Sequence, residues 1–98
     1  MPKRVTRRIA AQDLTDLFEQ STIWEKIFDG TFVTEVAASR DRPSTRWANA
    51  TSRILKHYSP QGSHIATTHC VCDEYGNKLH WDEKDLFIGG IVYYREGH

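Results

Sequence analysis

Three turn sequences divide the second half of the chain into short segments, and their spacing constrains the fold more than any other feature. They are Ser59-Pro60-Gln61-Gly62, Asp73-Glu74-Tyr75-Gly76-Asn77 and Gly89-Gly90. Each joins segments rich in β-branched and aromatic residues, a pattern typical of β-hairpins. The sequence therefore predicts an antiparallel meander with strands at 51–58, 63–72, 78–82, 85–88 and 91–95.

Residues 45–58 are open to two interpretations. A helical stripe is matched by Trp47, Thr51, Ile54, Leu55 and Tyr58. The turn at Pro60, however, is of the kind that joins two strands. We therefore expect a short helical turn near 45–50 and then a strand at 51–58.

The first half of the chain has the apolar spacing of helices, carried by Leu14, Leu17, Phe18, Trp24 and Phe28. This spacing predicts helices at 11–20 and 23–29, the second opened by a capping box of Thr22 and Glu25 and ended by Gly30. A strand at 31–38 and a polar loop at 39–46 follow. The fold class is thus α+β, with helices at roughly 11–29 packed on one face of an antiparallel meander of four to five strands.

The length, charge and cysteine content of the chain limit the kinds of protein that it can be. Ninety-eight residues suit one domain, predicted at 10–98 and preceded by a flexible basic arm at 1–9. The 13 Lys and Arg residues balance the 13 Asp and Glu residues, so the whole molecule is not a generic polyanion binder. No apolar run is long enough for a bilayer, which predicts no membrane partner. Cys70 and Cys72 are expected to be reduced thiols, which favours a cytoplasmic location.

The hairpin registers predict which side chains share a face of the sheet. A four-residue loop at Pro60 places His57 opposite His64, and a three-residue loop at Gly76 places Cys70 opposite His80. Alternation then gathers polar groups on one face: Arg53, His57, His64, Thr68, Cys70, His80 and Asp82. The other face is apolar and is expected to pack against the helices, through Ile54, Tyr58, Ile65, Val71, Leu79 and Trp81.

The polar face has the residue types for cleaving RNA without a metal, which requires a base, an acid and a cation that holds the phosphate. The predicted catalytic residues are His57, His64, His80, Arg53 and Thr68. A basic stripe predicts contacts to the phosphate backbone, through Arg40, Arg42, Arg46 and Lys56. We therefore expect a small RNA-binding domain or metal-independent endoribonuclease, with no cofactor and no metal.

The succession of helices and a meander bearing His, Arg and Thr resembles the small ribonuclease toxins of bacterial toxin–antitoxin and contact-inhibition systems. This resemblance of architecture implies an RNA substrate and a protein partner such as an antitoxin.

Several alternatives remain open at this point. The polar face can simply be solvated. It can hold zinc through His57, His64, Cys70 and His80, or Cys70 beside His80 can act as a nucleophile. His69 falls on the predicted apolar face and is interpreted as structural.

Neutral charge also fits a protein-binding module, an inhibitor or adaptor of phage or mobile-element type that binds a target protein. A homodimer is possible if the segment Ile91-Val92-Tyr93-Tyr94 lies at a sheet edge.

Overall fold

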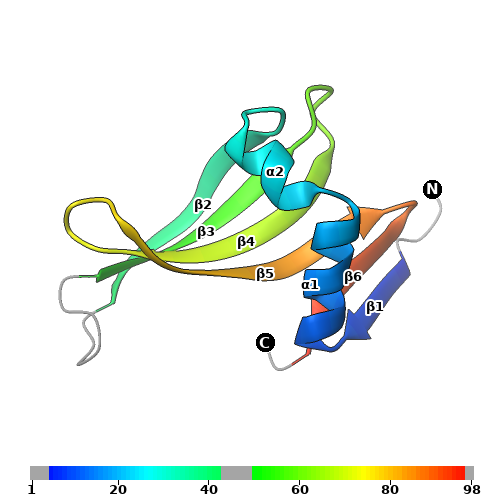
Figure 1. Cartoon of the computed structure of the whole chain (residues 1–98), viewed down its shortest axis with the longest axis horizontal. Coiled ribbons are helices and arrows are strands. Elements are labelled where there is room, and N and C mark those ends of the chain that lie inside the picture. Colours follow the sequence, from blue (N-terminus) through cyan, green and yellow to red (C-terminus); the bar gives the residue numbers. More distant parts are fainter. Residues whose placement is uncertain (1–4, 43–49, 97–98) are drawn as a thin grey trace.

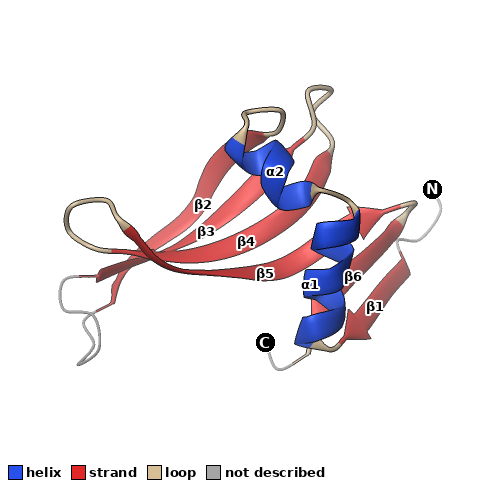
Figure 2. Cartoon of the chain, in the orientation of Figure 1, coloured by secondary structure: helices blue, strands red, loops and turns tan. Residues whose placement is uncertain are grey.

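The computed structural model describes residues 5–42 and 50–96 and consists of one sheet with two helices on one of its faces (Figures 1 and 2). The helices are α1 (Ala11–Gln20) and α2 (Ile23–Phe28). The strands are β1 (Val5–Ile9), β2 (Val33–Arg42), β3 (Ala50–Tyr58), β4 (His64–Cys72), β5 (Lys78–Ile88) and β6 (Ile91–Arg95). The predicted α+β class is confirmed.

The six strands follow the spatial order β1-β6-β5-β4-β3-β2. All neighbouring pairs are antiparallel except β1 and β6, which are parallel because the chain returns across the sheet through the helices and the meander. β1 was predicted to be part of a flexible arm. Its residues instead pair in register with β6, from Val5 opposite Ile91 to Ile9 opposite Arg95.

The two helices pack on the sheet through an aromatic and aliphatic core. Leu14 and Phe18 lie one helical turn apart on α1 and are fully buried with Ile23, Ala66 and Leu86. The predicted helices at 11–20 and 23–29 match α1 and α2 closely. The predicted capping box is wrong, because Thr22 has a left-handed backbone (φ 53°) and its hydroxyl donates to the carbonyl of Ser21 at 2.7 Å.

The predicted turns are present and close the hairpins. Gly89 and Gly90 both have positive φ, and they connect Ile88 to its partner Ile91 in a two-residue loop. The backbone amide of Asp73 donates to the carbonyl of Asn77 at 2.9 Å, as predicted for the turn at Gly76. Residues 51–58 form a strand and not a helix, because pairing on both sides outweighs the helical spacing of their apolar residues.

Four β-bulges change which side chains share a face. An extra residue interrupts the ladder at Ala37, Ile65, Leu79 and Lys84. Each bulge reverses the alternation on its own strand, so faces cannot be assigned from the turns alone. We call the side that carries the helices the helix face, and the opposite side, which no described helix or strand covers, the open face (Figure 1).

Three further boundaries differ from the predictions. β2 continues through residues 39–42, which were predicted to be a loop. The predicted connection near Asp82–Asp85 is part of the continuous strand β5, because the bulge at Lys84 absorbs the irregularity. The predicted helical turn near 45–50 lies mostly outside the described residues, and Ala50 itself begins β3.

The segment Ile91-Val92-Tyr93-Tyr94, which could pair with a second copy only from a sheet edge, is interior. β6 lies between β1 and β5, and the sheet edges are β1 and β2. Within the described residues, neither helix has the length and apolar character needed to cross a bilayer.

Candidate functional site

The structure divides the predicted catalytic residues between the two faces. On the helix face, His57 is fully buried, with Nδ1 2.7 Å from the hydroxyl of Thr34 and Nε2 2.8 Å from that of Thr68. Burial, with a smaller effect from nearby His64, lowers the pKa of His57 to about 4. His57 and Thr68 therefore cannot reach an RNA phosphate in this fold.

The expected common face is wrong because one turn and one bulge change the registers. At the Pro60 turn the amide of Ser59 donates to the carbonyl of Ser63, so that Tyr58, and not His57, lies beside His64. The bulge at Ile65 then pairs His57 with Ala66. On β5 the bulge at Leu79 places His80 opposite Val71. These shifts move His64 and His80 to the open face.

Cys70 lies on the helix face opposite Trp81, away from His80. Burial, followed by its hydrogen bond with Cys72, raises the pKa of the Cys70 thiol to about 11. The two sulfur atoms are 3.7 Å apart, within hydrogen-bond range, and form no disulfide. The zinc set and the Cys70 nucleophile considered from the sequence are therefore not assembled.

The predicted basic stripe is also divided. Arg40 and Lys56 are exposed on the open face, and Arg53 is exposed on the helix face opposite Ser39. The side chain of Arg42 and all of Arg46 lie outside the described residues.

A row of three rings crosses the open face at one end of the sheet. The ring centroids of Tyr58 and His64 are 5.3 Å apart, and those of His64 and Phe87 are 4.3 Å apart. All three side chains are half-buried, so each presents part of its surface to solvent. The row runs from β3 through β4 to β5.

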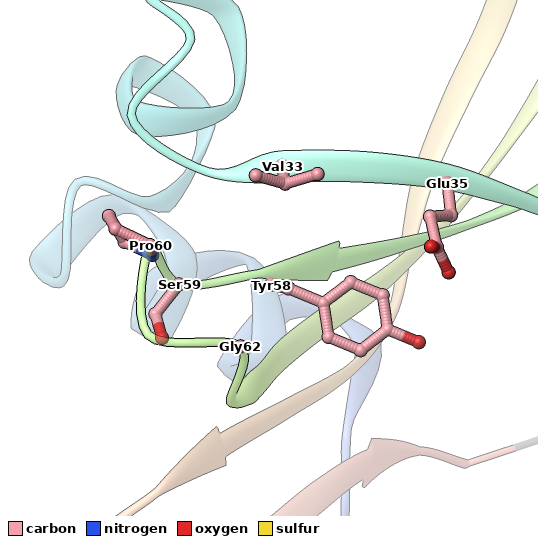
Figure 3. A pocket seen from close by; sticks show the side chains of 6 residues that line it. All are labelled: Val33, Glu35, Tyr58, Ser59, Pro60 and Gly62. Atoms are coloured by element: carbon pink, nitrogen blue, oxygen red, sulfur yellow. The ribbon is translucent and has the colours of Figure 1, made fainter.

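A hollow of about 440 Å³ lies at the Tyr58 end of this row (Figure 3). It is lined by Val33, Glu35, Tyr58, Ser59, Pro60 and Gly62. Its wall thus combines the ring of Tyr58 with a carboxylate and a hydroxyl.

A second row beside the rings is polar and crosses all six strands. The paired residues are, in order, Glu35, Lys56, Thr67, Asp85, Tyr94 and Arg8. The guanidinium of Arg8 lies over the ring of Tyr94, 5.7 Å from its centroid. Lys56, with Glu35 beside it, thus lies near the Tyr58 end of the ring row, and Arg8 lies beyond the Phe87 end. The carboxylate of Asp85 lies between the two cations.

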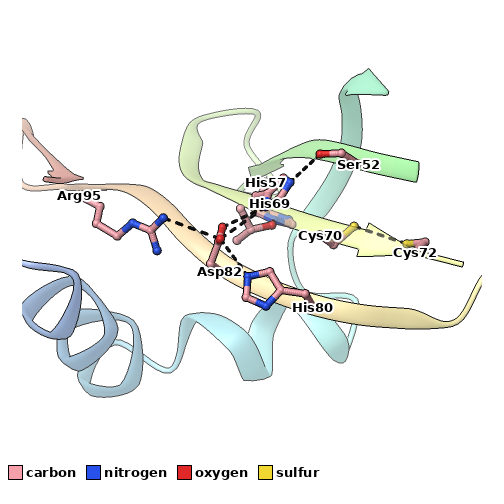
Figure 4. A network of polar contacts seen from close by, with 9 residues as sticks. Ser52, His57, His69, Cys70, Cys72, His80, Asp82 and Arg95 are labelled. Atoms are coloured by element: carbon pink, nitrogen blue, oxygen red, sulfur yellow. Dashed lines mark hydrogen bonds and ion pairs between the residues drawn. The ribbon is translucent and has the colours of Figure 1, made fainter. Parts of the chain in front are cut away.

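The most connected polar network lies further along the open face (Figure 4). Ser52 Oγ is 2.6 Å from His69 Nε2, and His69 Nδ1 is 3.4 Å from Asp82 Oδ2. His80 Nε2 lies 3.2 Å from the same carboxylate oxygen, and Arg95 lies 3.8 Å from it. Sequence reasoning missed Ser52, His69 and Arg95 as members of this network. Only the bulge at Leu79 brings His69 and His80 to one face.

The network has the residue types of a Ser-His-Asp triad but not its surroundings. A nucleophilic serine requires N–H donors that stabilise an oxyanion beside it. Ser52 lies in the interior strand β3, between partners Arg40 and Val71 whose backbones belong to the sheet ladders. The described residues thus provide no oxyanion hole at Ser52.

Comparison with known proteins gives no family for this chain. No protein-family model, curated protein or solved structure matches it. Its function is therefore inferred from the geometry of its own side chains.

Proposed function

We propose that the protein binds single-stranded RNA on the open face of its sheet. The observation that carries the proposal is the row of Tyr58, His64 and Phe87 rings across three adjacent strands. Successive rings on a sheet surface offer stacking partners for successive unpaired bases. The bases of duplex RNA are paired and stacked on each other, so aromatic side chains on a sheet can stack only on the bases of a single strand.

The hollow beside Tyr58 supports the same function. Its mixed lining suits one flat base that stacks on the Tyr58 ring while Glu35 or Ser59 accepts a hydrogen bond from its amino group. A base held there continues the line of the ring row.

The charges of the open face indicate moderate electrostatic attraction. Arg8, Arg40 and Lys56 are exposed and can reach phosphates, while the carboxylates of Glu35, Asp82 and Asp85 share the face. This balance agrees with the zero net charge of the chain. Stacking therefore supplies most of the proposed affinity, and phosphate contacts position the strand.

The test is fluorescence anisotropy of a labelled single-stranded RNA dodecamer with Phe87→Ala and Tyr58→Ala. Each substitution is expected to weaken binding about fivefold or more, since one base–ring stack contributes about 1–3 kcal/mol. Tyr75→Ala is the matched control, because Tyr75 is 81% exposed in the turn between β4 and β5, away from the ring row. Undiminished binding by Phe87→Ala and Tyr58→Ala would refute the proposal, as would a wild-type protein that does not bind at low salt.

Metal-independent cleavage of the bound RNA stays a prediction. Of the five predicted catalytic residues, His64 and His80 are on the open face, but they lie about seven residues apart along the sheet, roughly 20 Å. They cannot act on one phosphate together. Gel analysis of the same labelled RNA in EDTA reads cleavage directly, and His80→Ala and His64→Ala show which histidine contributes.

A second candidate function is the protein-binding module, which the edge strand β2 favours. β2 is ten residues long, and among the described strands it bonds only to β3. Val33 and Val36 on it are each 57% exposed. An extended segment of a partner protein can add to such an edge as a further strand. Crosslinking mass spectrometry tests this. Partner peptides attached along 33–40 support it, and loss of RNA binding in Phe87→Ala without loss of the crosslinks would separate the two functions.

A further inference from the structure

We infer that His69, His80 and Asp82 form a three-ligand site for a divalent transition metal, with Zn²⁺ the best fit. One ligand atom from each residue lies within 4.8 Å of the other two. The inference goes beyond RNA binding and does not depend on it, because none of the three residues belongs to the ring row.

The distances between these atoms suit a metal ion at their centre. His69 Nδ1 is 3.4 Å from Asp82 Oδ2, and His80 Nε2 is 3.2 Å from the same oxygen. Ligands bound tetrahedrally to zinc at about 2.0–2.1 Å are separated from each other by about 3.3 Å. Two edges of the coordination triangle therefore already have the required length.

Ser52 holds His69 in the orientation that binding requires. The 2.6 Å contact between Ser52 Oγ and His69 Nε2 directs Nδ1 towards Asp82. A hydroxyl can accept a hydrogen bond from Nε2–H as readily as it can donate one, so it supports the tautomer in which Nδ1 offers its lone pair. Such an outer partner is the usual companion of a metal-binding histidine.

The Asp82 carboxylate supplies a second, independent observation. Its Oδ1 atom is buried and has no hydrogen-bond partner, although the side chain as a whole is 17% exposed. Buried polar atoms are nearly always satisfied, and a cation that reaches both oxygens of this carboxylate would satisfy Oδ1. His69 Nδ1 lies 3.4 Å from each of the two oxygens. Arg95 approaches the other oxygen at 3.8 Å, too far for a hydrogen bond, so it offsets charge without occupying a coordination position.

The donor set selects the class of metal. Two imidazoles and one carboxylate suit Zn²⁺ and its neighbours in the first transition row, whereas Mg²⁺ and Ca²⁺ prefer oxygen ligands. The two thiols lie on the helix face and cannot contribute. Three protein ligands leave a fourth position, as in catalytic zinc sites, and the 46% exposure of His80 places that position next to solvent.

The test is isothermal titration of Zn²⁺ into tag-free protein that has been dialysed against EDTA. We expect one ion per chain, an affinity at least about tenfold lower in His80→Ala, and a loss of about 10–100-fold in Ser52→Ala, which removes only the outer partner. His64→Ala is the control, because His64 is the open-face histidine outside the cluster and should bind as the wild type does.

Cobalt spectroscopy tests the coordination geometry and the absence of thiolate ligands on the wild-type protein, so it does not depend on how well a variant folds. Wild-type protein with Co²⁺ should show tetrahedral visible bands without the intense near-ultraviolet band of a cobalt–thiolate bond. Absence of one-to-one binding in the wild type, equal affinity in a folded His80→Ala variant, or a thiolate band would each overturn the inference.

Discussion

His57 and Thr68, two of the residues predicted to act on RNA, are hydrogen-bonded to each other at 2.8 Å beneath the helices. Thr34 holds the second ring nitrogen of His57 at 2.7 Å. Both polar positions of the ring are thus satisfied inside the protein, which is how a buried histidine is normally stabilised. The trio Thr34, His57 and Thr68 joins β2, β3 and β4, so its role is structural.

Acid should therefore destabilise the fold through His57. Its pKa is about 4 in the folded protein and near 6.5 when unfolded, so below pH 6.5 the unfolded state binds more protons. The stabilisation is complete above pH 6.5 and is lost as the pH falls towards 4, by about 3 kcal/mol. Urea unfolding followed by circular dichroism from pH 4 to 7 measures this. Compared with His57→Gln, the wild type should lose more stability on acidification. Parallel curves for the two proteins would contradict the assignment.

The two cysteines should resist alkylation while the protein is folded. Both are buried, and the pKa of Cys70 is raised to about 11, so little thiolate is present at pH 8. Mass spectrometry after iodoacetamide treatment should find the native protein unmodified and the urea-unfolded protein modified twice. Rapid modification of the native protein would show that the helix face is more open than described.

Phe18 should be a major source of stability. It is fully buried and its ring lies 5.6 Å from that of Trp24, so Phe18→Ala should cost about 3–5 kcal/mol of unfolding free energy. Phe28→Ala is the control, because Phe28 contacts Trp24 and Trp81 but is 64% exposed, and it should cost about 1 kcal/mol or less. Chemical denaturation measures both values. Equal losses would mean that the helices are not anchored as described.

The salt dependence of RNA binding should distinguish the two faces. Lys56 and Arg53 are three residues apart on β3 and project to opposite faces. Lys56→Ala should reduce the slope of log affinity against log salt by about one, and Arg53→Ala should leave it unchanged. Anisotropy titrations at several salt concentrations give the slopes. A larger effect of Arg53→Ala would place the RNA on the helix face.

Local sequence signals predicted the positions of helices and turns better than they predicted which face of the sheet each side chain occupies. The boundaries of α1 and the turns at Gly76 and Gly89 follow from apolar spacing and glycine conformation, which act within a few residues. The strand at Val5–Ile9 gave no local signal, because its pairing with β6 joins residues more than 80 positions apart. Its basic composition instead suggested a flexible arm.

The residues of the metal cluster were visible in the sequence, but their proximity was not. His80 and Asp82 were both assigned to the polar face. A register without bulges places His69 on the other face of the sheet, so His69 was interpreted as a core residue. One extra residue at Leu79 brings Val71 opposite His80 and His69 opposite Asp82.

The sequence by itself determined the α+β class, the two helices and the three hairpin turns, since these depend on periodicity and on backbone conformations available to nearby residues. Only the tertiary structure decided which side chains meet. Bulges arise from the packing and twist of neighbouring strands, and each reverses the alternation beyond it. The bulge at Leu79 is the reason that His69, His80 and Asp82 share the open face. His57 is buried because the helices pack on the face that it shares with Thr68.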